Sequence, residues 1–320
     1  MSEPLLIHIG YHKTATTWLQ EHLFRNPDLG LAVRNGGDRI IREFVAPGPF
    51  AFEPASAQAV LSKHTLPGPT SRHLPVITQE RLSGSPHSGG YDSQIIADRL
   101  KAVFPEARIL IVIREQEAII LSAYKQYVRR GGGQPLGRYL APPRTGGDHL
   151  PGFRFEFFEY PLLFGYYQEL FGKARVLGLP YEMFVKQPET FVKTILRFCG
   201  LEAPDSLVTG LPFLDRPQRS LSYFSTTLKR RLSFVADEPS RFHRRSLFEL
   251  TAEQRHTLLS WLESFDRRLP VVIRLRSEDA AQAIIRRAVK DRYDRSNALM
   301  GRLIDLPLDP FGYRVQDTYG

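Results

Sequence analysis

A lysine and several hydroxyl side chains follow a short apolar run near the start of the chain. Residues 5 to 9 predict a buried strand, a tight turn follows, and Thr16 to Leu29 predicts a helix. The turn and the helix start read Lys13-Thr14-Ala15-Thr16-Thr17-Trp18. N–H groups and the dipole at a helix start attract an anion, and Lys13 adds a positive charge. This spacing predicts a phosphate site.

The turn is not a nucleotide-triphosphate loop of the GxxxxGK[ST] type. It is shorter, and its small residue, Ala15, follows Lys13 by two positions instead of preceding it.

A second candidate site follows the β-branched run Ile109 to Ile113, which predicts a strand buried on both faces. Kinases and ATPases with a phosphate loop usually place an acidic Mg²⁺ ligand after such a strand, whereas this chain has Arg114. Ser122 comes eight residues later, on the following helix. An arginine fork and a hydroxyl suit a further phosphate bound without metal. Lys125 and Arg129 share the helix face of Ser122 and could join them or remain solvated.

The elements that must position these residues alternate along the chain. Further strands are predicted at Leu31 to Arg34, Leu74 to Thr78, Arg108 to Ile113 (which contains the β-branched run) and Arg175 to Leu179. Helices are predicted at 92–103 with Asp92 as its cap, 115–130, 155–171, 188–198, after a capping box at Thr251, and at 278–303. Alternation of this kind predicts an α/β fold, with a parallel sheet flanked by helices and a largely helical C-terminal part.

The organisation predicts one domain over residues 1–320, with a core at about 5–201 and a helical extension at about 250–305. Residues 131 to 155 are rich in Gly and Pro and predict a long loop. No signal segment or apolar run of membrane-spanning length is present, so we expect a cytoplasmic protein. The single cysteine, Cys199, lies in an apolar run and excludes an intrachain disulfide.

The formal charge of +9 favours anionic partners. Basic residues are frequent between 216 and 245. This segment could be a solvated surface, or Arg216 and Arg219 with Ser220 could close over a phosphate.

Taken together, these motifs resemble the sulfotransferase family that uses 3′-phosphoadenosine-5′-phosphosulfate (PAPS), in its bacterial, carbohydrate- or small-molecule-modifying type. The family pattern K-[ST]-G-T-T-W matches residues 13–18, and its Arg and Ser, eight residues apart, match Arg114 and Ser122. The resemblance implies a P-loop-like fold. It also implies that residues 13–18 hold the phosphosulfate and that Arg114 and Ser122 hold the 3′-phosphate. A weaker match at 176–201 places Tyr181 against the adenine.

One departure is Ala15, which stands where the family usually has glycine. A left-handed conformation there would cost a methyl-bearing residue about 1 kcal/mol. We expect a helical conformation instead, at no cost.

The resemblance also indicates a base for the acceptor hydroxyl. Glu80 follows the strand that ends at Thr78, which favours it over His73 before that strand. Adjacent Arg81 could bind an acidic acceptor. His8 and His12 flank the turn and are expected to be structural.

The sequence therefore predicts transfer of a sulfonate from PAPS to a hydroxyl of a carbohydrate, glycolipid or small molecule. Lys13 would stabilise the developing charge and Glu80 would act as base, without metal. A P-loop kinase and a non-enzymatic polyanion- or RNA-binding protein are the alternatives. No nucleic-acid partner is expected, because the basic run at 229–231 is not interleaved with aromatic residues.

Overall fold

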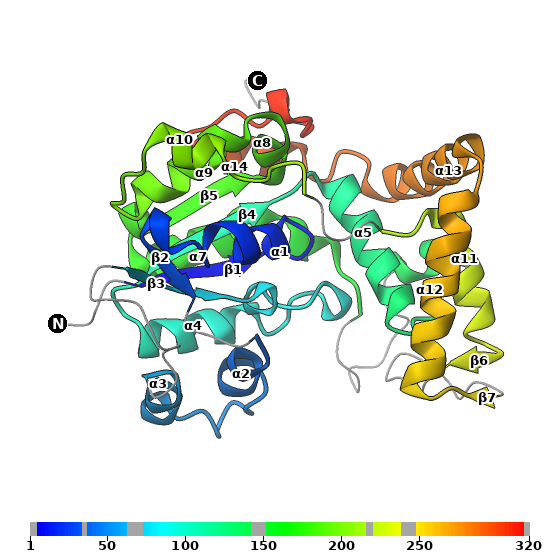
Figure 1. Ribbon diagram of the computed structural model, residues 1–320, viewed down its shortest axis with the longest axis horizontal. Helices are drawn as coiled ribbons and strands as arrows, with labels where there is room; N and C mark the ends of the chain where they lie inside the picture. Colours follow the sequence, from blue (N-terminus) through cyan, green and yellow to red (C-terminus); the bar gives the residue numbers. More distant parts are fainter. Residues whose placement is uncertain are drawn as a thin grey trace.

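The computed structural model describes residues 5–33, 37–62, 73–141, 152–215, 220–237 and 248–316. Its centre is a five-stranded parallel sheet with the order β2-β3-β1-β4-β5 (Figure 1). The strands are β1 (Leu6–Gly10), β2 (Leu31–Val33), β3 (Leu74–Thr78), β4 (Arg108–Ile113) and β5 (Val176–Pro180). This parallel sheet, flanked by helices, confirms the predicted α/β class.

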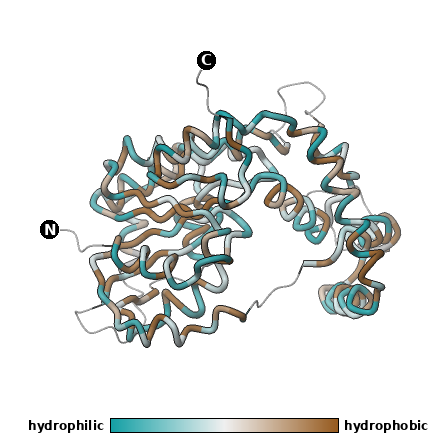
Figure 2. Tube along the Cα trace, turned by 90° about the horizontal axis from the view of Figure 1, so that it is seen from above, coloured by the Kyte–Doolittle hydropathy of each residue, from teal (hydrophilic) through white to brown (hydrophobic). Residues whose placement is uncertain are grey.

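The strands form where the sequence has runs of mostly apolar side chains. Ile109 to Ile113 are buried at 0–1% exposure, as a β-branched run covered on both faces requires. β3 and β4 have the predicted bounds, whereas β5 begins one residue later than expected. β2 ends at Val33, and Arg34 lies outside the described residues. In Figure 2, brown apolar segments run through the part of the trace that holds the sheet.

Helices pack on the sheet and on one another. α7 contacts β4, β5, α4 and α14, while α8 and α9 contact β5. The helices around the sheet are α1 (Thr16–Trp18), α2 (Gly37–Ile40), α3 (Pro54–Ser62), α4 (Ser93–Val103), α5 (Gln116–Arg129), α6 (Leu136–Tyr139), α7 (Tyr160–Phe171), α8 (Tyr181–Lys186), α9 (Pro188–Phe198), α10 (Asp205–Thr209) and α14 (Asp294–Leu303).

Three further helices form what we call the helical arm: α11 (Tyr223–Leu232), α12 (Ala252–Arg268) and α13 (Val271–Val289). α11 and α13 pack on α5, which places the arm beside that helix and away from β2 (Figure 1). Two short strands, β6 (Ala236–Asp237) and β7 (Phe248–Glu249), pair next to the arm. The predicted capping box of Thr251 and Gln254 is present at the start of α12.

Four predictions about helices were wrong in detail. The expected helix at 155–171 is a 3-10 turn over Phe155–Phe158 followed by α7, which begins at Tyr160. The expected helix at 278–303 is two helices, because α13 ends at Val289 and Lys290 has a left-handed φ of 51°. The expected helix at 16–29 is continuous only to Leu23, with a wide π turn over Leu19–Leu23 and a separate turn at Pro27–Leu29. Asp92 precedes α4 but does not cap it, because its carboxylate pairs with Arg81 instead.

Candidate active site

The turn after β1 is shaped by residues with positive φ. Gly10 has φ 95°, Lys13 has φ 65° and Ala15 has φ 61°. The hydroxyl of Thr14 donates to the carbonyl of Tyr11 at 2.6 Å and closes the turn from inside. Left-handed residues at alternate positions are typical of concave arrays of N–H groups that bind anions. α1 starts directly after this array, so its dipole acts on the same point.

The expectation for Ala15 was wrong. Its φ of 61° and ψ of 18° are left-handed, not helical. A β-carbon in that region costs about 1 kcal/mol, which glycine would avoid. The turn therefore holds its shape at a cost in stability.

The ends of four neighbouring strands deliver the predicted residues to one cavity. Lys13 follows β1, Glu80 follows β3, Arg114 follows β4 and Tyr181 follows β5. Parallel strands end at one edge of their sheet, where ligands of open α/β folds bind. The cavity, which we call the site cavity, measures about 310 Å³. Its lining is His12, Lys13, Ala15, Thr16, Thr17, Trp18, Glu80, Arg114, Ser122, Gln126, Tyr181, Phe184, Asp215 and Ser220.

Every predicted site residue except Thr14 lines this cavity; the buried Thr14 hydroxyl serves the turn itself. Sequence reasoning missed Gln126 and Phe184. Each lies one helical turn beyond a predicted residue, Gln126 after Ser122 and Phe184 after Tyr181, and that spacing was a usable signal. No comparable signal pointed to Asp215.

Arg114 is held by its neighbours on several sides. Its Nη1 donates to the carbonyl of Lys13 at 3.0 Å, so the two predicted sites are joined directly. Its guanidinium lies 4.8 Å from the ring centroid of Tyr181. The hydroxyl of Tyr160 donates to its backbone carbonyl. The neighbouring Glu182 carboxylate accepts from the Glu115 N–H at 3.0 Å.

Two buried donors on residues that line the cavity lack a partner within the described part of the chain. They are the hydroxyl of Thr16 and the Nε of Arg114. A buried donor without a partner costs about 1–3 kcal/mol, which an anionic ligand would relieve. The donor set thus fits an anionic ligand.

The charge around Lys13 points in the same direction. Burial lowers the pKa of Lys13 below its usual value, and the positive charge of Arg129 lowers it further. Arg130 and Arg114 act in the same sense. Negative charge bound in the cavity would relieve this repulsion.

Glu80 is positioned by a close contact between two strand ends. A β-carbon on Gly10 would lie 3.0 Å from the Cα of Glu80, so only glycine allows this approach. The Oε1 of Glu80 lies 3.9 Å from the Nδ1 of His12. His12 lines the cavity, whereas His8 is fully buried and bonded to the Thr78 hydroxyl at 2.9 Å.

The tautomer of His12 follows from its other nitrogen. Nε2 lies 3.1 Å from the carbonyl of Gly84, which can only accept, so Nε2 carries the proton. Nδ1 is then a buried lone pair directed at Glu80, and it has no hydrogen-bond partner among the described residues. Burial lowers the pKa of His12 to about 3, so its ring is neutral at pH 7.

Two other predicted roles are not supported. His73 precedes β3, so a strand of five residues separates it from the edge that carries Glu80. Arg81 does not face an acceptor freely, because its guanidinium pairs with the Asp92 carboxylate.

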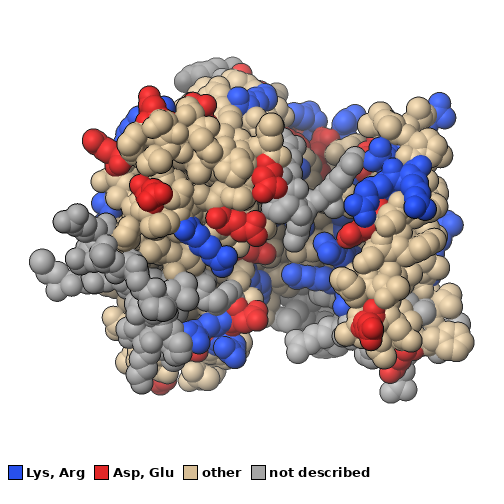
Figure 3. All heavy atoms as spheres, viewed as in Figure 1, with Lys and Arg blue, Asp and Glu red and all other residues tan. Residues whose placement is uncertain are grey.

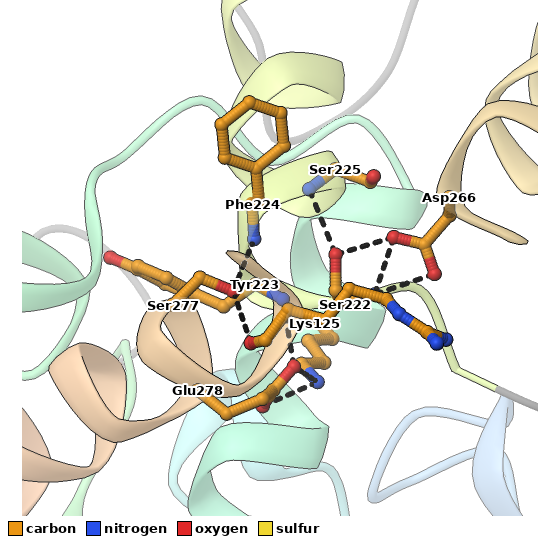
Figure 4. Close-up of polar contacts among 9 residues, drawn as sticks. Lys125, Ser222, Tyr223, Phe224, Ser225, Asp266, Ser277 and Glu278 are labelled. Atoms are coloured by element: carbon orange, nitrogen blue, oxygen red, sulfur yellow. Dashed lines mark hydrogen bonds and ion pairs between the residues drawn. The ribbon is translucent and has the colours of Figure 1, made fainter. Parts of the chain in front are cut away.

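Lys125 is also engaged elsewhere. Its ammonium binds both oxygens of Glu278 on α13, at 2.7 and 2.9 Å, and Glu278 accepts in turn from the N–H of Tyr223 (Figure 4). Nearby, Asp266 on α12 accepts from the N–H of Ser222 at the start of α11. The Lys125–Glu278 pair attaches the helical arm to α5, and the Ser222–Asp266 bond joins α11 to α12 within the arm. Lys125 therefore fixes the arm, whereas Arg129 lines a second cavity beside Lys13.

Part of the basic segment at 216–245 cannot be placed. Arg216, Arg219 and residues 238–245 lie outside the described residues. Ser220 lines the site cavity. Lys229 is buried and its ammonium donates to Ser233, so it does not belong to a solvated surface.

Within the described ranges, no three His, Cys, Asp or Glu side chains are grouped so that they could hold a metal ion. No described helix combines the length and apolar character needed to cross a membrane.

Comparison with known proteins gives one family match. The model of the sulfotransferase family matches residues 96–205, which include Arg114, Ser122 and Tyr181 but not the turn after β1. No curated protein matches the chain.

Several solved structures are similar at low identity. A sulfotransferase from Alicyclobacillus acidocaldarius is 16% identical, with a TM-score of 0.47, over 73% of this chain and 94% of its own. Mouse sulfotransferase SULT7A1, complexed with PAP, is 18% identical, with a TM-score of 0.40, over 65% of this chain and 63% of its own. A sulfotransferase domain from the olefin synthase of Synechococcus PCC 7002 is 13% identical, with a TM-score of 0.42, over 84% of this chain and 96% of its own. Such scores are too low to support an argument about the site.

The family match covers β4, α5 and β5, the elements that carry Arg114, Ser122 and Tyr181. This segment of the chain matches the sulfotransferase family, and the match indicates a sulfotransferase enzyme.

Proposed function

We propose that this enzyme transfers a sulfonate group from PAPS to a hydroxyl of a carbohydrate, glycolipid or small-molecule acceptor. The observation that supports this proposal most is the set of residues that follow the strands at one edge of the sheet. Four adjacent strands end there in a lysine, a carboxylate, an arginine and an aromatic ring around one cavity. Unpartnered donors on the turn after β1 and on Arg114 after β4 suit a nucleotide with two separate anionic groups.

The two groups of donors around the site cavity suit different parts of the nucleotide. The N–H groups of the turn, with Lys13, Thr16 and Thr17, suit the phosphosulfate. Arg114 and Ser122 suit the 3′-phosphate, because a guanidinium fork and a hydroxyl both donate to phosphate oxygens. Tyr181 offers a ring face for the adenine. When bound, PAPS supplies the activated sulfonate.

Glu80 suits the base, because its carboxylate lines the cavity close to the turn. It would take the acceptor's hydroxyl proton as the new oxygen–sulfur bond forms and the sulfur–oxygen bond to the 5′-phosphate breaks. Lys13 would stabilise the charge that develops on the phosphate, and adenosine 3′,5′-bisphosphate would leave.

We also propose that the helical arm and the sheet form one domain. α11 and α13 pack on α5, and Lys125 and Glu278 join the two parts.

Thermal-shift titration tests the choice of nucleotide. Adenosine 3′,5′-bisphosphate without Mg²⁺ should stabilise the protein by about 2.7 kcal/mol at one hundred times its Kd. Adenosine 5′-monophosphate, which lacks the 3′-phosphate, is the matched control and should stabilise less. Selective stabilisation by Mg-ATP would favour the kinase alternative and contradict the proposal.

A further inference from the structure

A second cavity opens beside Lys13 and has no assigned role. It measures about 430 Å³ and lies between the C-terminal end of α5 and the first turns of α12. Its lining, which defines what we call the basic cavity, is Lys13, Gln126, Arg129, Arg130, Ala252, Arg255, His256 and Leu259. Lys13 and Gln126 line the site cavity as well, so the two spaces meet at the lysine.

The lining of the basic cavity is one-sided in charge. One lysine and three arginines contribute to it, and no aspartate or glutamate among the described residues does. Arg255 donates to the carbonyl of Arg129 at 3.0 Å, so α12 brings its cations up to the end of α5. Figure 3 shows Lys and Arg side chains gathered along the hollow between the sheet and the helical arm.

The overall positive charge of the chain does not explain this lining. A third cavity of about 380 Å³ is lined by Tyr11, Glu156, Glu159 and neighbouring apolar and polar residues, with no lysine or arginine. Basic residues are therefore not spread evenly over the cavities of the described structure. They gather in the cavities that Lys13 lines, where the charges of Arg129 and Arg130 also lower the pKa of that lysine.

We propose that the basic cavity binds the acceptor, and that the acceptor is an anion: a hydroxylated molecule that carries a carboxylate, phosphate or sulfate ester near the hydroxyl to be modified. This inference rests on the proposed function. Arginine guanidinium groups bind all three anions through paired N–H donors. An anion held by Arg129 would bring the rest of the acceptor to Lys13, where the two cavities meet.

The experiment uses matched acceptors with the full-length enzyme and labelled PAPS. The carboxylate arm compares a uronic-acid tetrasaccharide with its carboxyl-reduced form. The phosphate arm compares methyl glucoside 6-phosphate with methyl glucoside. In at least one arm, kcat/KM should be about tenfold higher for the anion, and the preference should fall as salt is raised. The arm that responds identifies the anionic group.

Two arginine variants test whether the anionic acceptor is bound by Arg129 itself or only attracted by the overall positive charge of the protein. Arg129→Gln should reduce the preference for the anionic acceptor about tenfold, and Arg129→Lys should restore part of it. Arg287→Gln removes the same charge from an exposed position on α13 and should leave the preference unchanged.

Two results would overturn the inference: equal use of charged and neutral acceptors by the unaltered enzyme, or equal effects of Arg129→Gln and Arg287→Gln. Either result leaves the proposed function intact if adenosine 3′,5′-bisphosphate still binds. Failure of the bisphosphate to bind would instead overturn the proposed function itself.

Discussion

The binding groups on the β1 side of the site cavity and those on its β4 side are positioned in different ways. At the β1 end, the anion-binding shape comes from the backbone, with Lys13 and Ala15 in left-handed conformations and the Thr14 hydroxyl closing the turn. At the β4 end, a side chain is held in place, because Arg114 lies over Tyr181 and donates to the turn itself. The groups suited to chemistry, Lys13 and Glu80, belong to the first end. This division implies that changes at the β1 end alter turnover, whereas changes at the β4 end alter nucleotide affinity.

The largest expected effect tests the chemical end. Glu80→Gln removes the base while keeping the size of the side chain, so kcat should fall by about 10² to 10⁴-fold. Affinity for adenosine 3′,5′-bisphosphate, measured by calorimetry, should change little. Glu189→Gln, at an exposed position on α9, is the control. A kcat within threefold of the unaltered enzyme would remove Glu80 from the mechanism.

Arg114→Gln tests the recognition end. The loss of one charged fork should weaken binding of adenosine 3′,5′-bisphosphate about 10- to 100-fold, or about 1.4–2.7 kcal/mol. Binding of adenosine 5′-monophosphate should weaken far less, because it lacks the group that Arg114 would hold. Equal losses for the two nucleotides would show that Arg114 acts only by supporting the turn.

The dependence of stability on pH also distinguishes the two ends, because the β1 end carries the buried His12 and the β4 end carries Arg114, which is always charged. The pKa of His12 is about 3 in the fold, against about 6.5 when unfolded. Between these values the unfolded chain binds the extra proton, so stability falls as pH decreases from 6.5 towards 3. Each such group contributes a slope of up to about 1.4 kcal/mol per pH unit.

The measurement is urea unfolding of the unaltered protein and of His12→Gln at pH 7, 6 and 5. The variant should show a shallower loss of unfolding free energy on acidification. His8 and His87, whose pKa values burial also lowers to about 3, should sustain the remaining slope. Parallel curves for the two proteins would mean that His12 is protonated in the fold.

The smallest effect concerns the shape of the turn. Ala15→Gly relieves the left-handed strain but frees the unfolded chain, so a net gain of up to about 1 kcal/mol is expected. Ala283→Gly, at an exposed site within α13, should instead destabilise by about 1 kcal/mol. Thermal unfolding of both variants measures the contrast. A loss of stability in Ala15→Gly would show that the methyl group contributes packing that outweighs the strain.

The sequence could predict whatever depends on local pattern. The β-branched run of β4, the capping box of α12 and the spacing of Arg114 and Ser122 all depend on neighbouring residues, and each led to the correct element or cavity. The engagement of Lys125 could not be predicted, because its partner Glu278 is 153 positions away. The conformations of Ala15 and Lys290 were equally out of reach, because side-chain type alone favours a helix at both positions.

The helix α5 connects the site cavity to the basic cavity. It is one uninterrupted element about 20 Å long, with Ser122 and Gln126 on the site cavity and Arg129 on the basic cavity. A displacement of this helix by one substrate would be transmitted to the other as a rigid movement. Occupancy of the two cavities should then be thermodynamically linked, and any change that the nucleotide makes in acceptor affinity must be matched by an equal change in the reverse direction.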